Sequence, residues 1–380
     1  MQYKIQITTL TPVHIGSGAV LRKNMDFIQR ENKLHIIDYN KLGKILNKKQ
    51  IDLLTSYIEN DEPITKALPQ DLPYERYSKK TIPLHTNTSV LDFHEFITNA
   101  IHQPYIPGSS IKGYINTVLF REYVKARYKE KKLGLNSFHS RWSEKEQKRE
   151  YNFKDKNILG EMNNEQTHLS RFYRFSDAHF QSGTTYVDII NTYVLTPEDD
   201  WEKRPNLQNL AELIPSGELS HLTLQIPDEK TPFHHTITEK IKQHLPHTFQ
   251  KYFPLKIHHL FSLINQHTKA LIEKEISILE TTNEPFSETY ENKLAEISEK
   301  LEKENQNNSP DTAILRIGKF TGFNNLTGNW QEGYMEVEAY NQLIEQLNGK
   351  TNISLFPKSR RCTSKGEPIG FVELKLVDNS

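Results

Sequence analysis

The residues best suited to chemistry lie in residues 105–113, which read Tyr-Ile-Pro-Gly-Ser-Ser-Ile-Lys-Gly. Gly108, Ser109 and Ser110 can present backbone N–H groups and hydroxyls to an anion at the point where a helical pattern begins. The unpaired N–H groups and the dipole at the start of a helix attract phosphate, and Lys112 adds a positive charge. This segment lacks the Gly-x-x-x-x-Gly-Lys-Ser/Thr order of a P-loop, so it favours the phosphate of a polynucleotide over nucleotide hydrolysis.

Three further segments combine cationic side chains with small residues, which let another backbone approach closely. These segments are residues 13–18 with the following Arg22 and Lys23, residues 316–323 with Arg316, Gly318, Lys319 and Gly322, and residues 357–370 with Lys358, Arg360, Arg361 and Lys365. Each pattern alone is common turn chemistry. Their recurrence in one chain predicts a surface that binds a sugar-phosphate backbone.

The composition bounds the class of protein. Forty-eight Lys and Arg residues balance forty-eight Asp and Glu residues, so any nucleic-acid binding depends on local patches, such as residues 105–132 with seven basic and two acidic side chains. Cys362 is the only cysteine, which excludes an intrachain disulfide and a Cys-based zinc site. The first residues alternate as in a strand rather than a signal peptide, and no apolar run is long enough to cross a bilayer. We therefore expect a cytoplasmic protein without membrane contact.

The hydrophobic patterns predict an α+β fold. Strand patterns cover residues 2–10, 33–37, 184–194 and 219–226, and helical patterns cover residues 111–132 and the acidic stretch from about 230 to 308. Asp38 is placed to cap a helix that reaches Leu46, whereas residues 59–92 indicate an irregular connection. We predict one α+β domain at residues 1–165 and a second at residues 166–380, with a helical insertion at about residues 230–310.

Residues 9–18, 105–113 and 316–322, together with the ending Pro368-Ile-Gly-Phe-Val372, resemble the RAMP superfamily of CRISPR-associated proteins. Within it they are most similar to the fifth Csm subunits of type III-A effector complexes. This resemblance implies two ferredoxin-like, RRM-related domains with glycine-rich loops. It also implies a non-catalytic subunit, without a cofactor, that binds CRISPR RNA at the 3′ end of the complex and is needed for maturation of that end. The implied partners are the repeating backbone subunit and the small helical subunit, and a host trimming nuclease is a further candidate.

The residue chemistry is compatible with that role, because a guide of changing sequence has to be bound through phosphates and 2′-hydroxyls. We expect Lys112 to contact phosphate, with Gly108, Ser109 and Ser110 as donors. The further contacts expected are Arg22, Lys23, Arg316 and Lys319, with Gly318 and Gly322 shaping the third loop.

Two other functions remain open from the sequence. In the first, the chain is a metal-independent endoribonuclease of the RAMP type, with His14 as general acid or base. The apolar residues that flank His14 are also typical of a packed, hydrogen-bonded histidine with no role in catalysis. In the second, the chain is a protein-docking scaffold that touches no RNA. No metal site is expected, because pairs such as Asp177 with His179 lack further ligands at useful spacing.

Overall fold

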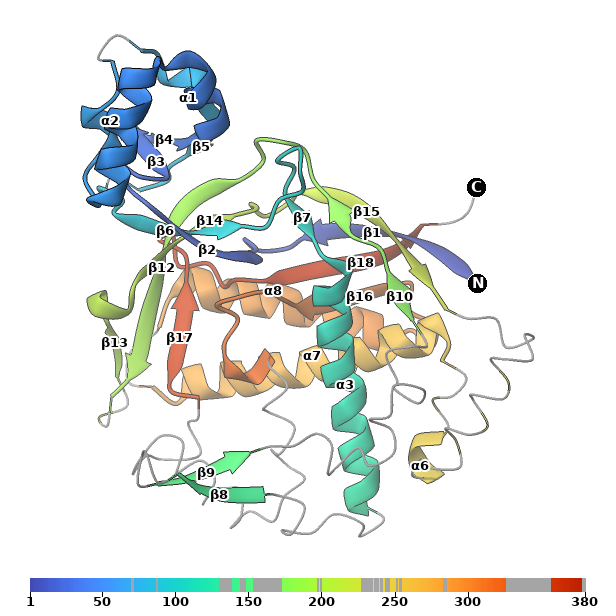
Figure 1. The fold of residues 1–380 in the computed structure, drawn as a ribbon. Helices are drawn as coiled ribbons and strands as arrows, with labels where there is room; N and C mark the ends of the chain where they lie inside the picture. The colour runs from blue at the N-terminus through green and yellow to red at the C-terminus, as the bar shows by residue number, and fades with distance from the viewer. Residues whose placement is uncertain are drawn as a thin grey trace.

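The computed structural model shows a mixed α+β protein built on several antiparallel or mixed sheets (Figure 1). The structure describes residues 1–69, 72–86, 88–129, 139–143, 148–152, 173–196, 198, 200–226, 235, 239, 242, 247–250, 252, 255–282, 286–325 and 357–377. The α+β class predicted from the sequence is confirmed.

The first sheet has five strands in the order β10 (Arg174–Phe175), β15 (Leu219–Gln225), β1 (Gln2–Thr9), β18 (Phe371–Val377) and β16 (Thr312–Arg316). All neighbours in this sheet are antiparallel. The strand β1 lies between two strands from the far end of the sequence, with Ile5 opposite Leu222 on one side and Leu376 on the other. Because side chains alternate along a strand, Ile5 and Ile7 are buried on one face while Lys4 and Gln6 lie on the other.

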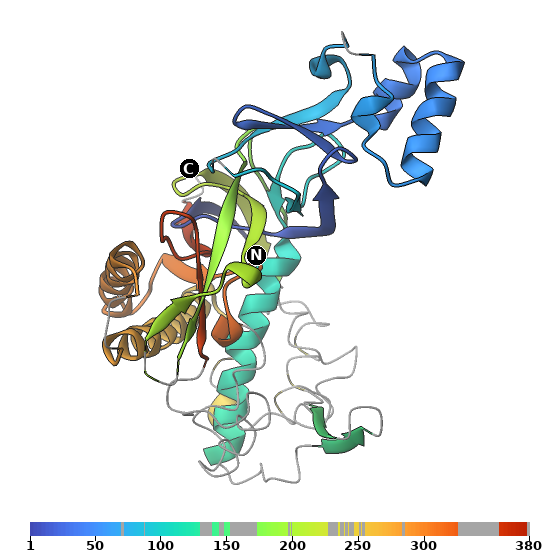
Figure 2. The same ribbon diagram turned by 90° about the vertical axis from the view of Figure 1, so that its left-hand side faces the viewer.

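Two long helices contribute to the core beneath β1. Helix α3 (Gly108–Lys129) and helix α7 (Ile257–Glu280) share one hydrophobic cluster with the buried face of β1. Helix α7 also closes the free edge of β16, because the Asn265 amide donates to the Thr312 carbonyl (2.8 Å) and accepts from the Ile314 N–H (2.9 Å). Helix α8 (Glu288–Asn305) lies beside α7 on one flank, away from α3 (Figure 2), and the short α6 (His247–Gln250) contacts α3.

A second sheet lies beyond the end of β1. Its order is β13 (Trp201–Lys203), β12 (Tyr186–Leu195), β14 (Asn209–Leu213), β6 (Asp92–Phe96) and β2 (Gly16–Arg22), and β17 (Ser359–Cys362) also pairs with β12. Two smaller pairs are β7 (Tyr105–Ile106) with β11 (Ala178–His179), and β8 (His139–Ser143) with β9 (Lys148–Asn152). Short 3₁₀ turns are Ile64–Lys66, Tyr74–Arg76, Pro205–Leu207 and Phe323–Asn325.

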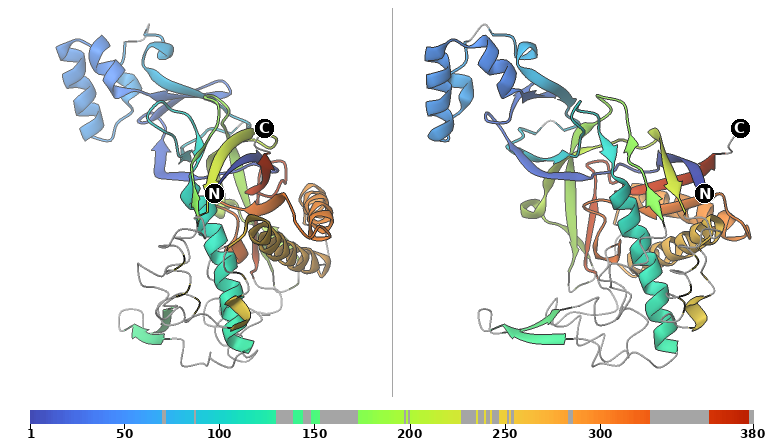
Figure 3. Two further views of the ribbon diagram at one scale, coloured as in Figure 1. Left: turned by 90° about the vertical axis from the view of Figure 1, so that its right-hand side faces the viewer. Right: turned by 45° about the vertical axis from the view of Figure 1, so that its right-hand side comes forward.

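A small module is inserted between β2 and β6 and projects from the sheets in both views of Figure 3. It contains β3 (Phe27–Arg30), β4 (Lys33–Ile37), β5 (Ser78–Pro83), α1 (Tyr39–Ile45) and α2 (Lys48–Glu59). The Asp38 carboxylate accepts from the N–H groups of Asn40 and Lys41, which confirms the predicted helix start, and Asn47 forms a capping box with Gln50. The prediction of an irregular connection over residues 59–92 is wrong at β5, which pairs with β4.

The two halves of the sequence are interleaved in space. Strand β1 belongs to a sheet otherwise formed after residue 173, and β2 and β6 share a sheet with β12 and β14. The predicted boundary at residue 165 lies outside the described residues, so the division into two ferredoxin-like domains stays a prediction. Helices α7 and α8 lie within the predicted helical stretch. In the part of the chain that the structure describes, no helix is long and apolar enough to span a bilayer.

Candidate functional site

Three of the four glycine-containing segments meet beside His14. The Lys319 N–H donates to the His14 carbonyl (3.0 Å), and a Cβ atom on Gly318 would lie only 2.3 Å from that oxygen. Gly318 also has φ +94°, a left-handed conformation that favours glycine. The fourth segment joins through Gly370, whose N–H donates to the Pro12 carbonyl (2.8 Å) and whose carbonyl accepts from Ile317 (2.8 Å). The structure therefore brings together the first, third and fourth segments.

Cationic side chains from these segments face solvent on the strand pair β2 and β6. Exposed Lys319 places its Nζ atom 3.2 Å from His94 Nδ1 and 5.2 Å from the centroid of the Phe320 ring. Arg22 lies opposite Asp92, two residues from His94, and so on the same face of the pair. Its ion pair with Asp61 (3.1 Å) leaves 58% of the Arg22 side chain exposed, so the guanidinium remains accessible to a phosphate.

Lys23 follows Arg22 directly, whereas Gly322 lines a small hollow that also includes Arg316 and Glu275. The Lys23 ammonium donates to the Ser89 hydroxyl (2.7 Å), which leaves further N–H donors of the ammonium. Gly322 has φ +87°, and a Cβ atom built there would meet nothing within 4 Å, so the loop is open on that side.

Helix α3 begins at Gly108, three residues before the start predicted at residue 111, and the first donor of the Gly108 segment is engaged. The Gly108 N–H donates to the Asp177 carboxylate (2.8 Å), and a Cβ atom on Gly108 would lie 2.2 Å from the Phe175 carbonyl oxygen. Glycine is therefore needed here for close packing against β10. This corrects the expectation that the Gly108 N–H is free for phosphate. Ser109 is exposed and Ser110 is half-buried, with the Ser110 N–H donating to the Pro107 carbonyl (2.9 Å).

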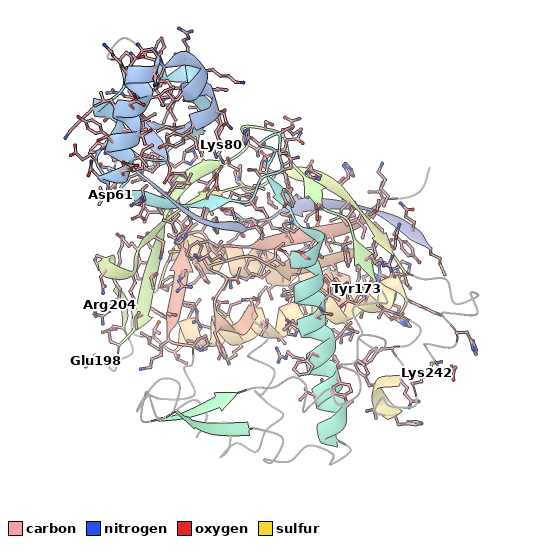
Figure 4. The ribbon with its side chains drawn as sticks, viewed as in Figure 1. Asp61, Lys80, Tyr173, Glu198, Arg204 and Lys242 are labelled. Carbon is pink, nitrogen blue, oxygen red and sulfur yellow. The ribbon has the colours of Figure 1, made fainter. Side chains whose placement is uncertain are left out.

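Lys112 lies on the first turn of α3, with its Nζ atom 5.9 Å from the centroid of the Tyr173 ring. Burial, reinforced by the nearby charge of Arg174, lowers the pKa of Lys112. The Tyr173 hydroxyl in turn bonds to Asn116 of the same helix, and Figure 4 shows Tyr173 beside α3. Lys112 is thus held over the short strand β10.

The Lys112 and Lys319 loops flank one hydrogen-bonded ladder. Lys319 bonds to His14, the adjacent Ile15 carbonyl accepts from Ile97 (2.8 Å), and the Ile97 carbonyl accepts from Tyr105 (3.4 Å). Each hydrogen-bonded step spans about 4.8 Å and the step from His14 to Ile15 about 3.3 Å, so the backbones of Lys319 and Tyr105 are no more than roughly 18 Å apart. The two loops form neighbouring contact points rather than a single pocket.

Arg316 does not belong to the surface. Only 3% of the residue is exposed, and its guanidinium donates to the Ile369 carbonyl (2.8 Å), to the Glu275 carboxylate (3.0 Å) and to the Tyr290 hydroxyl (3.1 Å). This corrects the expectation that Arg316 contacts phosphate. Burial opposes the charge on Glu275, but Arg316 and Arg360 outweigh it and hold the pKa of that carboxyl below its usual value.

His14 is fully buried. Its Nδ1 atom lies 2.7 Å from the Glu212 carbonyl, which can only accept, so Nδ1 carries the proton. The other nitrogen, Nε2, is buried and has no hydrogen-bond partner among the described residues. The rings of Phe96 and Phe320 pack against the imidazole, with centroids 6.1 and 5.4 Å away. A substrate has no access to this nitrogen, so the geometry favours a packed histidine over a general acid or base.

The buried imidazole makes stability depend on pH. Burial lowers the pKa of His14 to about 4; the Glu212 hydrogen bond opposes this shift, and the nearby His94 and Lys319 reinforce it. Below pH 6.5, His14 is protonated in the unfolded chain but stays neutral in the folded protein. The free energy of unfolding should therefore fall as the pH drops from 6.5 towards 4. Each unit by which the folded and unfolded pKa values of His14 differ corresponds to about 1.4 kcal/mol of unfolding free energy.

We expect His14→Gln to flatten this part of the profile of unfolding free energy, measured by urea unfolding at several pH values. His259→Gln, on an exposed side chain, is the matched control and should keep the wild-type slope. Half-buried His267, whose pKa burial lowers to about 3, gives the unfolding free energy of both variants a remaining dependence on pH. An unchanged slope in His14→Gln would contradict the assignment of a neutral, sealed imidazole.

Glu212 was not predicted from the sequence, although it connects the His14 segment, β5 and β6. Its buried carboxylate accepts from the Lys80 ammonium (2.8 Å), the Thr185 hydroxyl (2.6 Å) and the Phe96 N–H (3.0 Å). Lys80 lies on β5 where the inserted module meets the sheets (Figure 4), so this ion pair ties the module to β14. The available signal was one acidic residue at the end of an apolar strand, directly before buried Leu213.

No metal centre is indicated in the described ranges, where no three His, Cys, Asp or Glu side chains are grouped as ligands. Asp177 and His179, considered above as a ligand pair, have other contacts. Asp177 bonds to Gly108, and the His179 ring lies 5.3 Å from that of Tyr105. Both support the packing of the Gly108 segment.

Comparisons with known proteins agree with this architecture. The family model of the RAMP superfamily matches residues 6–352. The CRISPR system Cms protein Csm5 of Enterococcus italicus is 30% identical over 31% of this chain and 42% of its own length. The protein of the same name from Streptococcus thermophilus is 28% identical over 31% of this chain and 37% of its length. The match therefore spans about two fifths of the length of these curated relatives.

Solved structures match over almost the whole chain. One chain in a cryo-EM structure of a Csm–crRNA–target RNA ternary complex of a type III-A CRISPR-Cas system has a TM-score of 0.59 at 18% identity, covering 99% of this chain and all of that one. The crystal structure of T. onnurineus Csm5 has a TM-score of 0.59 at 16% identity, covering 97% and 99%. At such low identity these neighbours establish the fold. Because the family model matches residues 6–352, most of this chain, the chain belongs to the RAMP superfamily, and within that superfamily it is similar to the Csm5 proteins.

Proposed function

We propose that this protein is a non-catalytic, RNA-binding subunit of a type III-A Csm effector complex, which binds the 3′ region of the CRISPR RNA and supports maturation of that end. The observation that carries the proposal is the exposed position of Lys319 and Arg22 on one face, beside a glycine loop that packs against the His14 segment. Similarity to the Csm5 proteins supplies the context. The subunit's partners in the complex would be the repeating backbone subunit and the small helical subunit.

The geometry supports contact with the backbone of RNA rather than with its bases. The cationic groups are on flexible, exposed side chains, whereas the aromatic ring of the third loop, Phe320, is only 5% exposed and packs on His14. Phosphate contacts of this kind are independent of sequence and sensitive to salt. Such a surface suits a guide whose sequence changes from one complex to the next.

The proposed contacts are the two loops described above. Lys319, in the loop of residues 316–323, would bind phosphate together with Arg22 and Lys23, and Gly318 and Gly322 would shape the backbone of that loop. Lys112, in the segment of residues 105–113, would bind a further phosphate, with Ser109 and Ser110 as hydroxyl donors. Arg316 and Gly108 serve the fold at these loops and make no direct contact with RNA in this account.

The direct test is a comparison of assembled complexes with and without this subunit. Binding of labelled CRISPR RNA is measured across a salt series, and the length of the RNA 3′ end is read on a sequencing gel. We expect the subunit to protect the 3′ region, to steepen the salt dependence and to leave RNA uncut when it is added alone. Unchanged protection of the 3′ region would contradict the proposal. Cutting by the purified subunit would instead support the nuclease alternative.

A further inference from the structure

The five-stranded sheet leaves most of one face open to solvent. Helices α3 and α7 pack with the face that carries Ile5 and Ile7. On the other face, α8 packs over Ile314 at the β16 end, and no described helix covers the β10, β15 and β1 end. An antiparallel sheet commonly leaves one face in solvent, and the side chains on such a face are available to a partner.

The open part of this face is hollowed. A hollow of about 510 Å³ lies over β15, between β1 and β10, and it is lined by Gln2, Lys4, Ser176, His221, Leu222 and Thr223. Register fixes this arrangement, since Lys4 lies opposite Thr223, and Gln6 lies opposite His221. Most of the lining side chains are polar and exposed, so they are available to a ligand.

Two unpaired cations border the hollow. Lys4 lies on β1, and Arg174 lies on β10 opposite Gln225, two strand spacings or roughly 10 Å from β1. Within the described residues, neither cation forms an ion pair with an acidic group. The nearest acidic residue on this face of β18, Glu373, is buried and paired with Lys300. The charged side chains that border the hollow are therefore positive among the residues that the structure describes.

The hollow is continuous with the proposed contact at the start of α3. Strand β10 is an edge strand that lies against the first turns of α3, where Gly108 touches the Phe175 carbonyl. Arg174 on the outer face of β10 is close enough for its charge to act on Lys112. Cations thus follow one another from Lys112, past Arg174, to Lys4. Figure 3 shows α3, β10, β15 and β1 side by side in this order.

The chemistry of this face fits a polyanion better than a protein. A stable protein interface has an apolar, often aromatic core, whereas the described part of this face near β10, β15 and β1 carries no Phe, Tyr or Trp. Gln and Thr side chains beside Lys and Arg can bond to phosphate and to 2′-hydroxyls. With no Phe, Tyr or Trp in the described part of this surface, and with the His221 imidazole as a ring in its lining, most contacts would be with the RNA backbone.

We propose that the RNA strand bound at the start of α3 continues across the edge strand β10 and lies in the hollow over β15, with Arg174 and Lys4 on successive phosphates. This inference rests on the proposed function, because it extends the same RNA beyond the glycine loops. It adds a second RNA surface on the open face of the first sheet.

The test uses the reconstituted effector complex with its CRISPR RNA and the double variant Lys4→Glu/Arg174→Glu. Lys48→Glu/Lys303→Glu makes the same change in net charge at exposed helix positions and is the matched control. Affinity across a salt series and the nuclease-protected length of the RNA are measured. The test variant should bind roughly tenfold more weakly, with a shallower salt dependence and a shorter protected segment, while the control stays like wild type.

The outcomes separate this inference from the function it extends. If Lys4→Glu/Arg174→Glu binds and protects RNA like wild type while Lys112→Glu/Lys319→Glu loses affinity, the open face is not an RNA surface and the proposed function stands. If the wild-type subunit adds no RNA protection, both proposals fail. If the test variant drops out of the complex while its thermal unfolding matches wild type, the face docks a protein neighbour and the inference is overturned.

Discussion

Replacing Lys112 and Lys319 together by glutamate is expected to weaken binding of CRISPR RNA by the assembled complex by roughly 100-fold or more. A hydrogen bond between charged groups contributes about 1.5–3 kcal/mol, and each substitution both removes a cation and adds a repelling carboxylate. Lys319 is exposed beside the His14 segment, and Lys112 is half-buried over Tyr173. Filter binding at several salt concentrations measures the effect, and the slope against salt should become shallower.

The same measurement on Lys48→Glu/Lys303→Glu separates local contacts from overall charge. Both lysines are exposed on helices away from the loops, and the net charge falls by the same amount. We expect this control to remain within a few-fold of wild type. Equal losses in the two double variants would mean that the loops carry no particular contact.

Arg316→Ala is expected to destabilise the protein by about 3–5 kcal/mol, because removing one partner of a buried ion pair leaves uncompensated charge. Glu275, nine-tenths buried, would lose its ion pair with Arg316 and keep Arg360 (3.1 Å) and the Tyr290 hydroxyl as partners. The Ile369 carbonyl and the Tyr290 hydroxyl would each lose a donor. Chemical denaturation measures the loss. Arg22→Ala is the control, since its exposed pair with Asp61 should contribute within about 0.5 kcal/mol.

The two arginines should behave oppositely towards RNA. Arg22→Ala should keep the fold and weaken RNA binding, whereas Arg316→Lys, wherever it remains folded, should bind RNA like wild type. RNA affinity that depends on Arg316 in a folded variant would reverse the assignment of this residue to the core.

The sequence predicted local features better than spatial ones. The helix capped by Asp38 and the strand at Lys33–Ile37 follow from side chains a few residues apart, and the structure has both. The helix expected from residue 111 is also present, but it begins three residues earlier, at Gly108. The placement of β1 between β15 and β18 depends on contacts more than two hundred residues apart. No periodic pattern in one segment reports such a partner.

The site shows the same limit. The glycines of the residue 316–323 segment suggested from the sequence a close approach to another backbone. The structure has such an approach between Gly318 and the His14 carbonyl, which only glycine tolerates. Whether a nearby arginine faces water is decided elsewhere, by Glu275 and Tyr290 on two other helices, and Arg316 was misassigned for that reason. Asp177 likewise engages the Gly108 N–H from a segment 69 residues away.

A cryo-EM map of the assembled complex with its CRISPR RNA, resolved well enough to place phosphates, tests the central claim most directly. We expect a phosphate within ion-pair distance, about 4 Å, of the Lys319 or Lys112 ammonium, with the RNA passing along the hydrogen-bonded ladder that joins the two loops. Loops that face solvent or a protein neighbour, with the RNA elsewhere, would contradict it.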